Sequence, residues 1–172
     1  MLFRELQRQI KLLFCFSLLP EDCVWIGRLL AARNARGGRF VAWLCGRAMK
    51  KIRKLYGIEI CSFENIGENL VMVHPYCITV NPKTIIGDNC VLFKGCTIGS
   101  IRSGKRMGVP IIENNVAICT NASIFGGIRI GHDSLIAANS FVNLDVPLHS
   151  VVLGNPATIH HKENASSDYC SN

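Results

Sequence analysis

The sequence predicts a mainly β fold, a left-handed parallel β-helix of hexapeptide repeats, preceded by a short α-helical N-terminal extension. The first observation is that apolar residues recur at every sixth position. A step of six fits neither the 3.6-residue period of a helix nor the two-residue alternation of a strand. It fits a chain wound as a triangular prism, with one short strand and one turn on each face. The recurring residues form two runs, Val80, Ile86, Leu92 and Ile98, and then Ile112, Ile118, Ile124, Ile130, Ile136 and Val142.

The second observation concerns the residue four positions after each of these, which should also point into the prism. Such a position needs a small or branched side chain. None of these residues is charged, and only Ile128 is bulky. They are Thr84, Cys90, Cys96, Val116, Ala122, Ile128, Ser134, Ser140 and Val146.

The third observation is a change of pattern at Gly57. Residues 2–19, about 21–33 and about 39–56 read as helices, with a break at Pro20 and an end at Gly57. Phe40 and Trp43 of the last helix could be core residues or interface anchors. The residues of this helix that fall toward one side are Val41, Leu44, Met49, Ile52 and Leu55.

These patterns divide the chain into a basic helical extension (1–57), a prism (58–163) and a polar tail (164–172). Ile98 and Ile112 are fourteen residues apart, two steps plus two residues, so a Gly-rich basic loop (99–109) leaves a coil corner. A stack of coils needs a cap at each end. We expect the helices to cap one end and the segment 147–156 to cap the other.

The charge of the chain lies in its first third. Residues 1–57 carry twelve Lys or Arg against three acidic residues, a net charge of +9, while the whole chain carries +7. This charge suits an anionic membrane surface, although a solvated helix face is the plainer explanation. Nucleic acid is not an expected partner, because the basic residues lack interleaved aromatics.

The longest apolar stretch, Leu12 to Pro20, is too short to span a membrane, and no signal cleavage site follows it. We therefore expect a cytoplasmic location, with peripheral membrane contact through residues 1–57. The nine cysteines are odd in number and form no Cys-x-x-Cys pair, which favours buried free thiols and no metal site.

From Gly57 to about Glu163 the chain resembles the serine acetyltransferases of the hexapeptide-repeat acyltransferase superfamily. The resemblance implies an acetyl-CoA-dependent O-acetyltransferase that assembles as a homotrimer. The segments that carry it are GIEI (57–60), IGENLVMVHP (66–75), IIGDNCVLFKGCTIGS (85–100) and VVLGNPATI (151–159).

The resemblance implies that His74 is the general base and that Glu59, fifteen residues earlier, is the acid that orients it. The pair makes chemical sense, because a carboxylate on one ring nitrogen fixes the tautomer and stabilises the imidazolium that forms when the other nitrogen takes a proton. A structural histidine at a coil corner is the alternative for His74.

Three departures from the family pattern concern the acceptor. Val73 stands where those enzymes have Asp, and Gly108 and Val109 stand where they have Arg and His, with Pro110 retained. A site built on buried polar contacts loses discrimination without them. We therefore expect a different acceptor. Short proteins of this design with a GKR-type loop resemble acetyltransferases of surface or capsular polysaccharides, which implies a sugar hydroxyl as the acceptor. Serine is the alternative acceptor, and a non-catalytic scaffold is a second alternative.

The resemblance also implies a coenzyme A groove between neighbouring prisms. Gly99, Ser100, Thr120 and Ala138 would contact the pantetheine arm, and Lys105 and Arg106 the phosphates. Small residues at coil corners are also what turn geometry requires.

A metal-dependent hydratase would need three converging histidines, and the prism before its cap supplies only His74 and His132. No metal is expected. We expect His149, His160 and His161, in the cap and tail, to be solvated.

Overall fold

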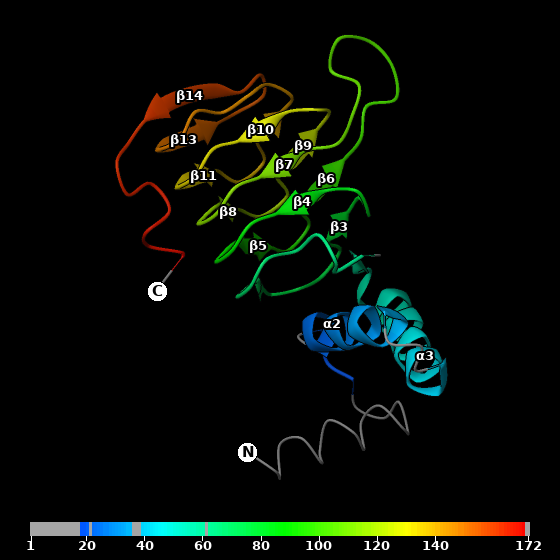
Figure 1. Ribbon diagram of the computed structural model, residues 1–172. Helices are drawn as coiled ribbons and strands as arrows, with labels where there is room; N and C mark the ends of the chain where they lie inside the picture. The colour runs from blue at the N-terminus through cyan, green and yellow to red at the C-terminus, as the bar shows by residue number, and fades with distance from the viewer. Residues whose placement is uncertain (1–17, 21, 36–38, 61, 171–172) are drawn as a thin grey trace.

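The computed structural model describes residues 18–20, 22–35, 39–60 and 62–170. Two helices lie at one end of a stack of short strands, and an antiparallel hairpin lies at the other end (Figure 1). The predicted order of an α-helical extension followed by a mainly β body is confirmed. The helix expected over residues 2–19 falls almost entirely outside the described residues.

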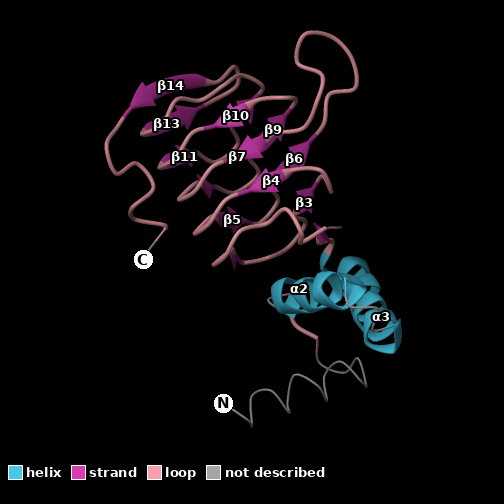
Figure 2. Ribbon diagram, in the orientation of Figure 1, coloured by secondary structure: helices cyan, strands magenta, loops and turns pink. Residues whose placement is uncertain are grey.

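Three sheets form the faces of the prism (Figure 2). Sheet A contains β1 (Glu59–Ile60), β3 (Thr79–Val80), β6 (Thr97–Gly99), β9 (Ser123–Phe125) and β12 (Phe141–Val142). Sheet B contains β4 (Ile85–Ile86), β7 (Ile111–Ile112) and β10 (Arg129–Ile130). Sheet C contains β2 (Val71–Val73), β5 (Val91–Phe93), β8 (Ala117–Ile118), β11 (Ser134–Ile136), β13 (Ser150–Leu153) and β14 (Thr158–His161).

The six-residue repeat forms the core of the prism, as predicted. Its ten apolar residues are at most 3% exposed, and the nine residues of the second inward set are at most 4% exposed. Parallel register stacks each repeat residue on its equivalent in the next coil, as Val80 on Ile98 and Ile98 on Ile124. Asn69, Asn89 and Asn115 take the left-handed backbone conformation at the equivalent turn of successive coils, and asparagine tolerates this conformation well.

Cys90 and Cys96 are completely buried free thiols at inward positions, as predicted. Burial disfavours the charged thiolate and raises the pKa of each to about 12. Both cysteines therefore act as small core residues.

Helices α2 (Asp22–Ala35) and α3 (Arg39–Tyr56) match the two later helices expected from the sequence. Ile26 of α2, Ile52 of α3 and Ile58 are fully buried and belong to the same hydrophobic cluster as the prism core. The Arg28 guanidinium also donates to the carbonyl oxygen of Gly67 in the first coil. The helices thus cap the prism by sharing its core.

Leu55, which the sequence places on the apolar side of this helix, is 55% exposed. It lies in the last turn of α3, at the edge of the apolar side. Phe40 and Trp43 are also exposed rather than core residues. Neither α2 nor α3, the helices that the structure describes, is long and apolar enough to cross a membrane.

The end of the chain folds back over sheet C instead of leaving the prism as a polar tail. Ala165 and Ser166 are buried, and Tyr169 packs edge-on against Phe93 with ring centroids 5.7 Å apart. The Asp133 carboxylate accepts hydrogen bonds from the backbone amides of both buried residues and from the Ser166 hydroxyl, at 2.8–3.2 Å. A fourth bond, 2.8 Å long, joins it to Nδ1 of His149.

This arrangement predicts that Asp133→Asn destabilises the fold by about 2 kcal/mol at neutral pH. Burial disfavours the charged carboxylate, but the hydrogen bonds from His149, Ser166 and Ala165 outweigh it and lower the pKa of Asp133 from 3.8 to about 2. Because the folded pKa is the lower one, this stability is complete above about pH 5 and is lost as the pH falls toward 2. Urea unfolding at pH 7 and at pH 3 measures the difference in free energy of unfolding between variant and wild type. This difference should be roughly half as large at pH 3 as at pH 7.

The exposed Asp168 provides the control, because Asp168→Asn should change stability by less than about 0.5 kcal/mol. Equal losses from both substitutions, or a gap independent of pH, would contradict the proposed role of Asp133.

Candidate active site

One corner of the prism, where sheet C turns toward sheet A, stacks three of the predicted site residues and a lysine in one column. Strand register aligns Val73 with Phe93, Val91 with Ala117, and Ala117 with Leu135. The residues that follow these strands therefore lie above one another on successive coils, about 4.8 Å apart. They are His74, Lys94, Thr120 and Ala138, and we call this column the His74 corner.

Backbone hydrogen bonds hold the column together. The Lys94 amide donates to the Val73 carbonyl at 3.2 Å, and the Asn121 amide donates to the Lys94 carbonyl at 3.1 Å. The Asn139 amide donates to the Thr120 carbonyl at 3.0 Å. Thr120 therefore lies two coils, about 10 Å, from His74, and Ala138 lies one coil further.

His74 occupies a tight turn that leaves its imidazole accessible. Its φ of +48° is in the left-handed region, and the Tyr76 amide donates back to the His74 carbonyl at 2.8 Å. The side chain is exposed, and its ring has no hydrogen bond to the residues that the structure describes. Such a histidine is open to a ligand on its solvent side.

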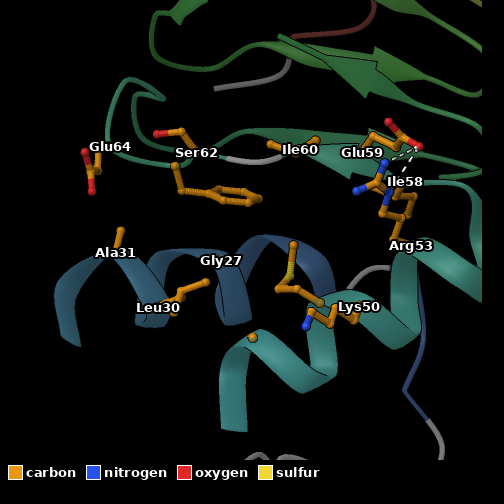
Figure 3. A pocket seen from close by; sticks show the side chains of 13 residues that line it. Gly27, Leu30, Ala31, Lys50, Arg53, Ile58, Glu59, Ile60, Ser62 and Glu64 are labelled. Carbon is orange, nitrogen blue, oxygen red and sulfur yellow. Dashed lines mark hydrogen bonds and ion pairs between the residues drawn. The ribbon is translucent and has the colours of Figure 1, made fainter. Parts of the chain in front are cut away.

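Glu59 lies on β1, beside Thr79, and is held by a residue that the sequence did not suggest. Both Nε and Nη2 of Arg53, in the last turn of α3, lie 3.1 Å from its Oε1 atom (Figure 3). Within the described ranges no hydrogen bond joins Glu59 to His74, and the second carboxylate oxygen, Oε2, has no partner. One oxygen is thus fixed by Arg53, while the other remains available.

The Arg53–Glu59 pair stands at the edge of a cavity of about 280 Å³ between the helices and the first coil (Figure 3). Leu30, Met49 and Phe63 supply apolar walls, and Lys50 lies at the rim. Glu59 therefore contacts both the helical cap and the first coil.

The next corner, where sheet A turns toward sheet B, carries the loop. The Ile101 and Gly108 backbones close its neck with a pair of hydrogen bonds, 3.0 and 2.9 Å long. Lys105 and Arg106 are exposed beyond this neck, and Gly99 and Ser100 lie just before it, half-buried. A groove of about 380 Å³ runs beneath the loop and adds Lys83 and Arg102 as cations.

The loop returns against two consecutive glycines, and this contact determines the residue at position 108. The Gly127 amide donates to the Arg106 carbonyl at 2.9 Å, and a Cβ atom at Gly108 would lie 3.0 Å from the Gly127 Cα atom. Gly108 also has a φ of +138°, which favours glycine. An arginine at position 108 would therefore require a different backbone conformation of this loop.

The predicted coenzyme A residues fall into two sets. Thr120 and Ala138 lie in the His74 corner, whereas Gly99, Ser100, Lys105 and Arg106 lie at the loop corner, with the strands of sheet A between them. Lys94 was missed, although it is the second residue after Leu92 and so follows the same rule as Ser100, Thr120 and Ala138.

The prediction that His149 is solvated is wrong. Its side chain is 26% exposed, with Nδ1 2.8 Å from Asp133 and 3.4 Å from Glu163. Its ring also packs edge-on against His132 and His161, and it has a structural role in holding the chain end. His160 and His161 are exposed as expected, and no group of side chains within the described residues could hold a metal ion.

Comparison with known proteins gives consistent matches of sequence and of structure. A serine acetyltransferase of Staphylococcus aureus is 34% identical over 139 residues, covering 79% of this chain and 62% of that protein. The structure of the Neisseria gonorrhoeae serine acetyltransferase in complex with serine matches with a TM-score of 0.66 at 28% identity, over 80% of this chain and 55% of that one. That of the Brucella abortus enzyme in complex with coenzyme A matches with a TM-score of 0.67 at 28% identity, over 81% and 54%.

No model of a protein family matches the chain. The chain spans 62% of the length of the Staphylococcus aureus relative and 48% of the length of a serine acetyltransferase from Synechococcus elongatus. The matched part includes the prism and its left-handed coiling, and so confirms the fold class predicted from the hexad repeat.

Proposed function

The chain is a serine acetyltransferase-like member of the hexapeptide-repeat acyltransferase superfamily, and from this premise we propose that it transfers an acetyl group from acetyl-CoA to a hydroxyl group. The observation that carries the proposal is the His74 corner. An exposed histidine stands there in line with the small residues Thr120 and Ala138, where a thioester arm can lie along the prism.

In the proposed reaction His74 accepts the proton of the acceptor hydroxyl while the oxygen bonds to the acetyl carbonyl carbon. The carbon–sulfur bond then breaks, and the protonated imidazole returns its proton to the departing thiolate. Glu59 would orient the imidazole through its free oxygen, Oε2, and Arg53 would hold the other oxygen. Arg53 is in this sense a positioning residue.

The two sets of predicted coenzyme A residues lie at different corners of one prism. They come together only if the His74 corner of one subunit lies beside the loop corner of a neighbouring subunit. We propose a homotrimer for this reason, with the loop cations Lys105 and Arg106 near the phosphates of the co-substrate and Lys94 beside the base. The exposed apolar side chain of Val71, on the face of sheet C, favours such an assembly. Within it, residues 1–57 would form the cap, 58–163 the catalytic prism and 164–170 a strap over sheet C.

We propose L-serine as the first acceptor to consider, because a similar enzyme is known in complex with serine. The neutral residues Val73, Gly108 and Val109 leave the serine zwitterion without the expected polar contacts, so a loop cation such as Arg106 would have to bind its carboxylate. Those same three residues favour a second candidate, a sugar hydroxyl, which has no carboxylate to bind.

The test is release of coenzyme A from acetyl-CoA, followed as free thiol, with L-serine and with a panel of sugars and nucleotide sugars. We expect saturable stimulation by serine. In Arg106→Ala the KM for serine should rise if Arg106 binds the serine carboxylate, whereas a rise in the KM for acetyl-CoA alone would assign Arg106 to the phosphates. Stimulation by a sugar alone would replace serine by the second candidate. Absence of turnover with every acceptor would support the non-catalytic scaffold.

A further inference from the structure

The outer side of α3 carries aromatic and basic side chains in one continuous row. Phe40, Trp43, Arg47, Lys50 and Lys54 are three or four residues apart, so they lie along one side of the helix. All five are exposed, Phe40 at 66% and Trp43 at 55%, while the opposite side of α3 is buried against α2 and the first coil. We call these five residues the α3 stripe.

The aromatic end of the stripe is organised. The rings of Phe40 and Trp43 stack with centroids 6.2 Å apart and planes 22° apart. The Arg47 guanidinium lies 5.0 Å from the centroid of the Trp43 ring. The two rings therefore form one exposed aromatic cluster, with a cation held over the Trp43 ring.

The rest of the stripe carries positive charge with no acidic partner among the residues that the structure describes. Helix α3 contains six basic residues and no acidic one. In the part of the chain that the structure describes, Arg47, Lys50 and Lys54 form no ion pair. This distribution differs from that of Arg53, whose charge is matched by Glu59.

We propose that the α3 stripe docks the protein on the surface of an anionic lipid bilayer. Tryptophan and phenylalanine rings bury favourably at the boundary between headgroups and acyl chains, and Lys and Arg nearby are attracted to anionic headgroups. A second copy of this chain is a poorer occupant, because two stripes face to face would bring like charges together. The helices form one end of the prism, so this contact leaves the three sheets clear of the membrane (Figure 1).

The first test is flotation of the full chain with vesicles of phosphatidylcholine and phosphatidylglycerol in a ratio of about two to one. We expect binding at low salt that weakens at about 0.5 M salt, and little binding to phosphatidylcholine alone. Arg47→Glu/Lys54→Glu should lower the partition coefficient at least tenfold. The control is Lys105→Glu/Lys162→Glu, which makes the same charge change on exposed residues outside the helices and should bind like wild type.

The second test follows insertion of the rings. In Trp25→Phe, the fluorescence of Trp43 should shift to the blue when these vesicles are added, and Phe40→Ala/Trp43→Ala should reduce flotation. Unchanged flotation of either stripe variant, or an unshifted spectrum, would overturn the proposal. A smaller sedimenting assembly of the stripe variants, with vesicle binding unchanged, would instead identify the stripe as an interface between copies. Neither readout depends on acetyl transfer, so failure here leaves the proposed catalytic function untouched.

Discussion

Replacing His74 with asparagine should lower the turnover of acetyl-CoA by about 10³-fold, because the proposed reaction would lose its general base. Asparagine is a sharper substitution than alanine at this position. It tolerates the left-handed backbone, with its φ of +48°, and so preserves the turn. The side chain is exposed and forms no hydrogen bond to the residues that the structure describes, so circular dichroism and urea unfolding should match wild type. The measurement is the rate of thiol release at saturating acetyl-CoA and acceptor.

The matched control is His160→Asn, on the exposed surface of β14, which should retain full turnover. Glu59→Gln should reduce turnover less than the loss of His74 does, since Glu59 acts through the imidazole. The double variant should then be no slower than His74→Asn alone. Full activity of His74→Asn would exclude this histidine as the base. If the double variant were slower than His74→Asn alone, Glu59 would act independently of His74.

The hexad repeat made the prism predictable. Each repeat adds one strand and one turn with the same inward positions, so a local pattern determines every contact between coils. This is why both inward sets, from Val80 to Val146, are buried as expected. The two later helices were predictable for a similar reason, since the buried side of α3 recurs with the helical period.

Contacts outside the repeat were not predictable in this way. The Asp133 carboxylate accepts hydrogen bonds from Ser166, 33 residues later, and no repeat in the sequence predicts this contact. The Arg53–Glu59 pair depends on how α3 ends above the first coil. Lys94 differs, because its place in the His74 corner follows from the repeat and could have been deduced. The site residues themselves came from the family resemblance, and their roles stay proposals.

Ile86→Ala should destabilise the fold by about 3 to 4 kcal/mol, the cost of an unfilled cavity in a closely packed core. Ile86 is 1% exposed and stacks on Ile112 in the next coil, so neighbouring coils cannot collapse around the lost atoms. Its neighbour Ile85, on the same strand, is 48% exposed. Ile85→Ala should cost less than about 1 kcal/mol. Urea unfolding of both variants, followed by circular dichroism at one protein concentration, measures the difference.

This pair of substitutions tests the register of the prism as well as its stability. Successive residues of a strand point to opposite faces, so a slip of one residue would exchange the environments of Ile85 and Ile86. The two losses would then be reversed. Similar losses at both positions would mean that sheet B is covered in solution, as a trimer would cover it. If only Ile86→Ala lowers the free energy of unfolding strongly, Ile86 points into the prism, as the six-residue register predicts.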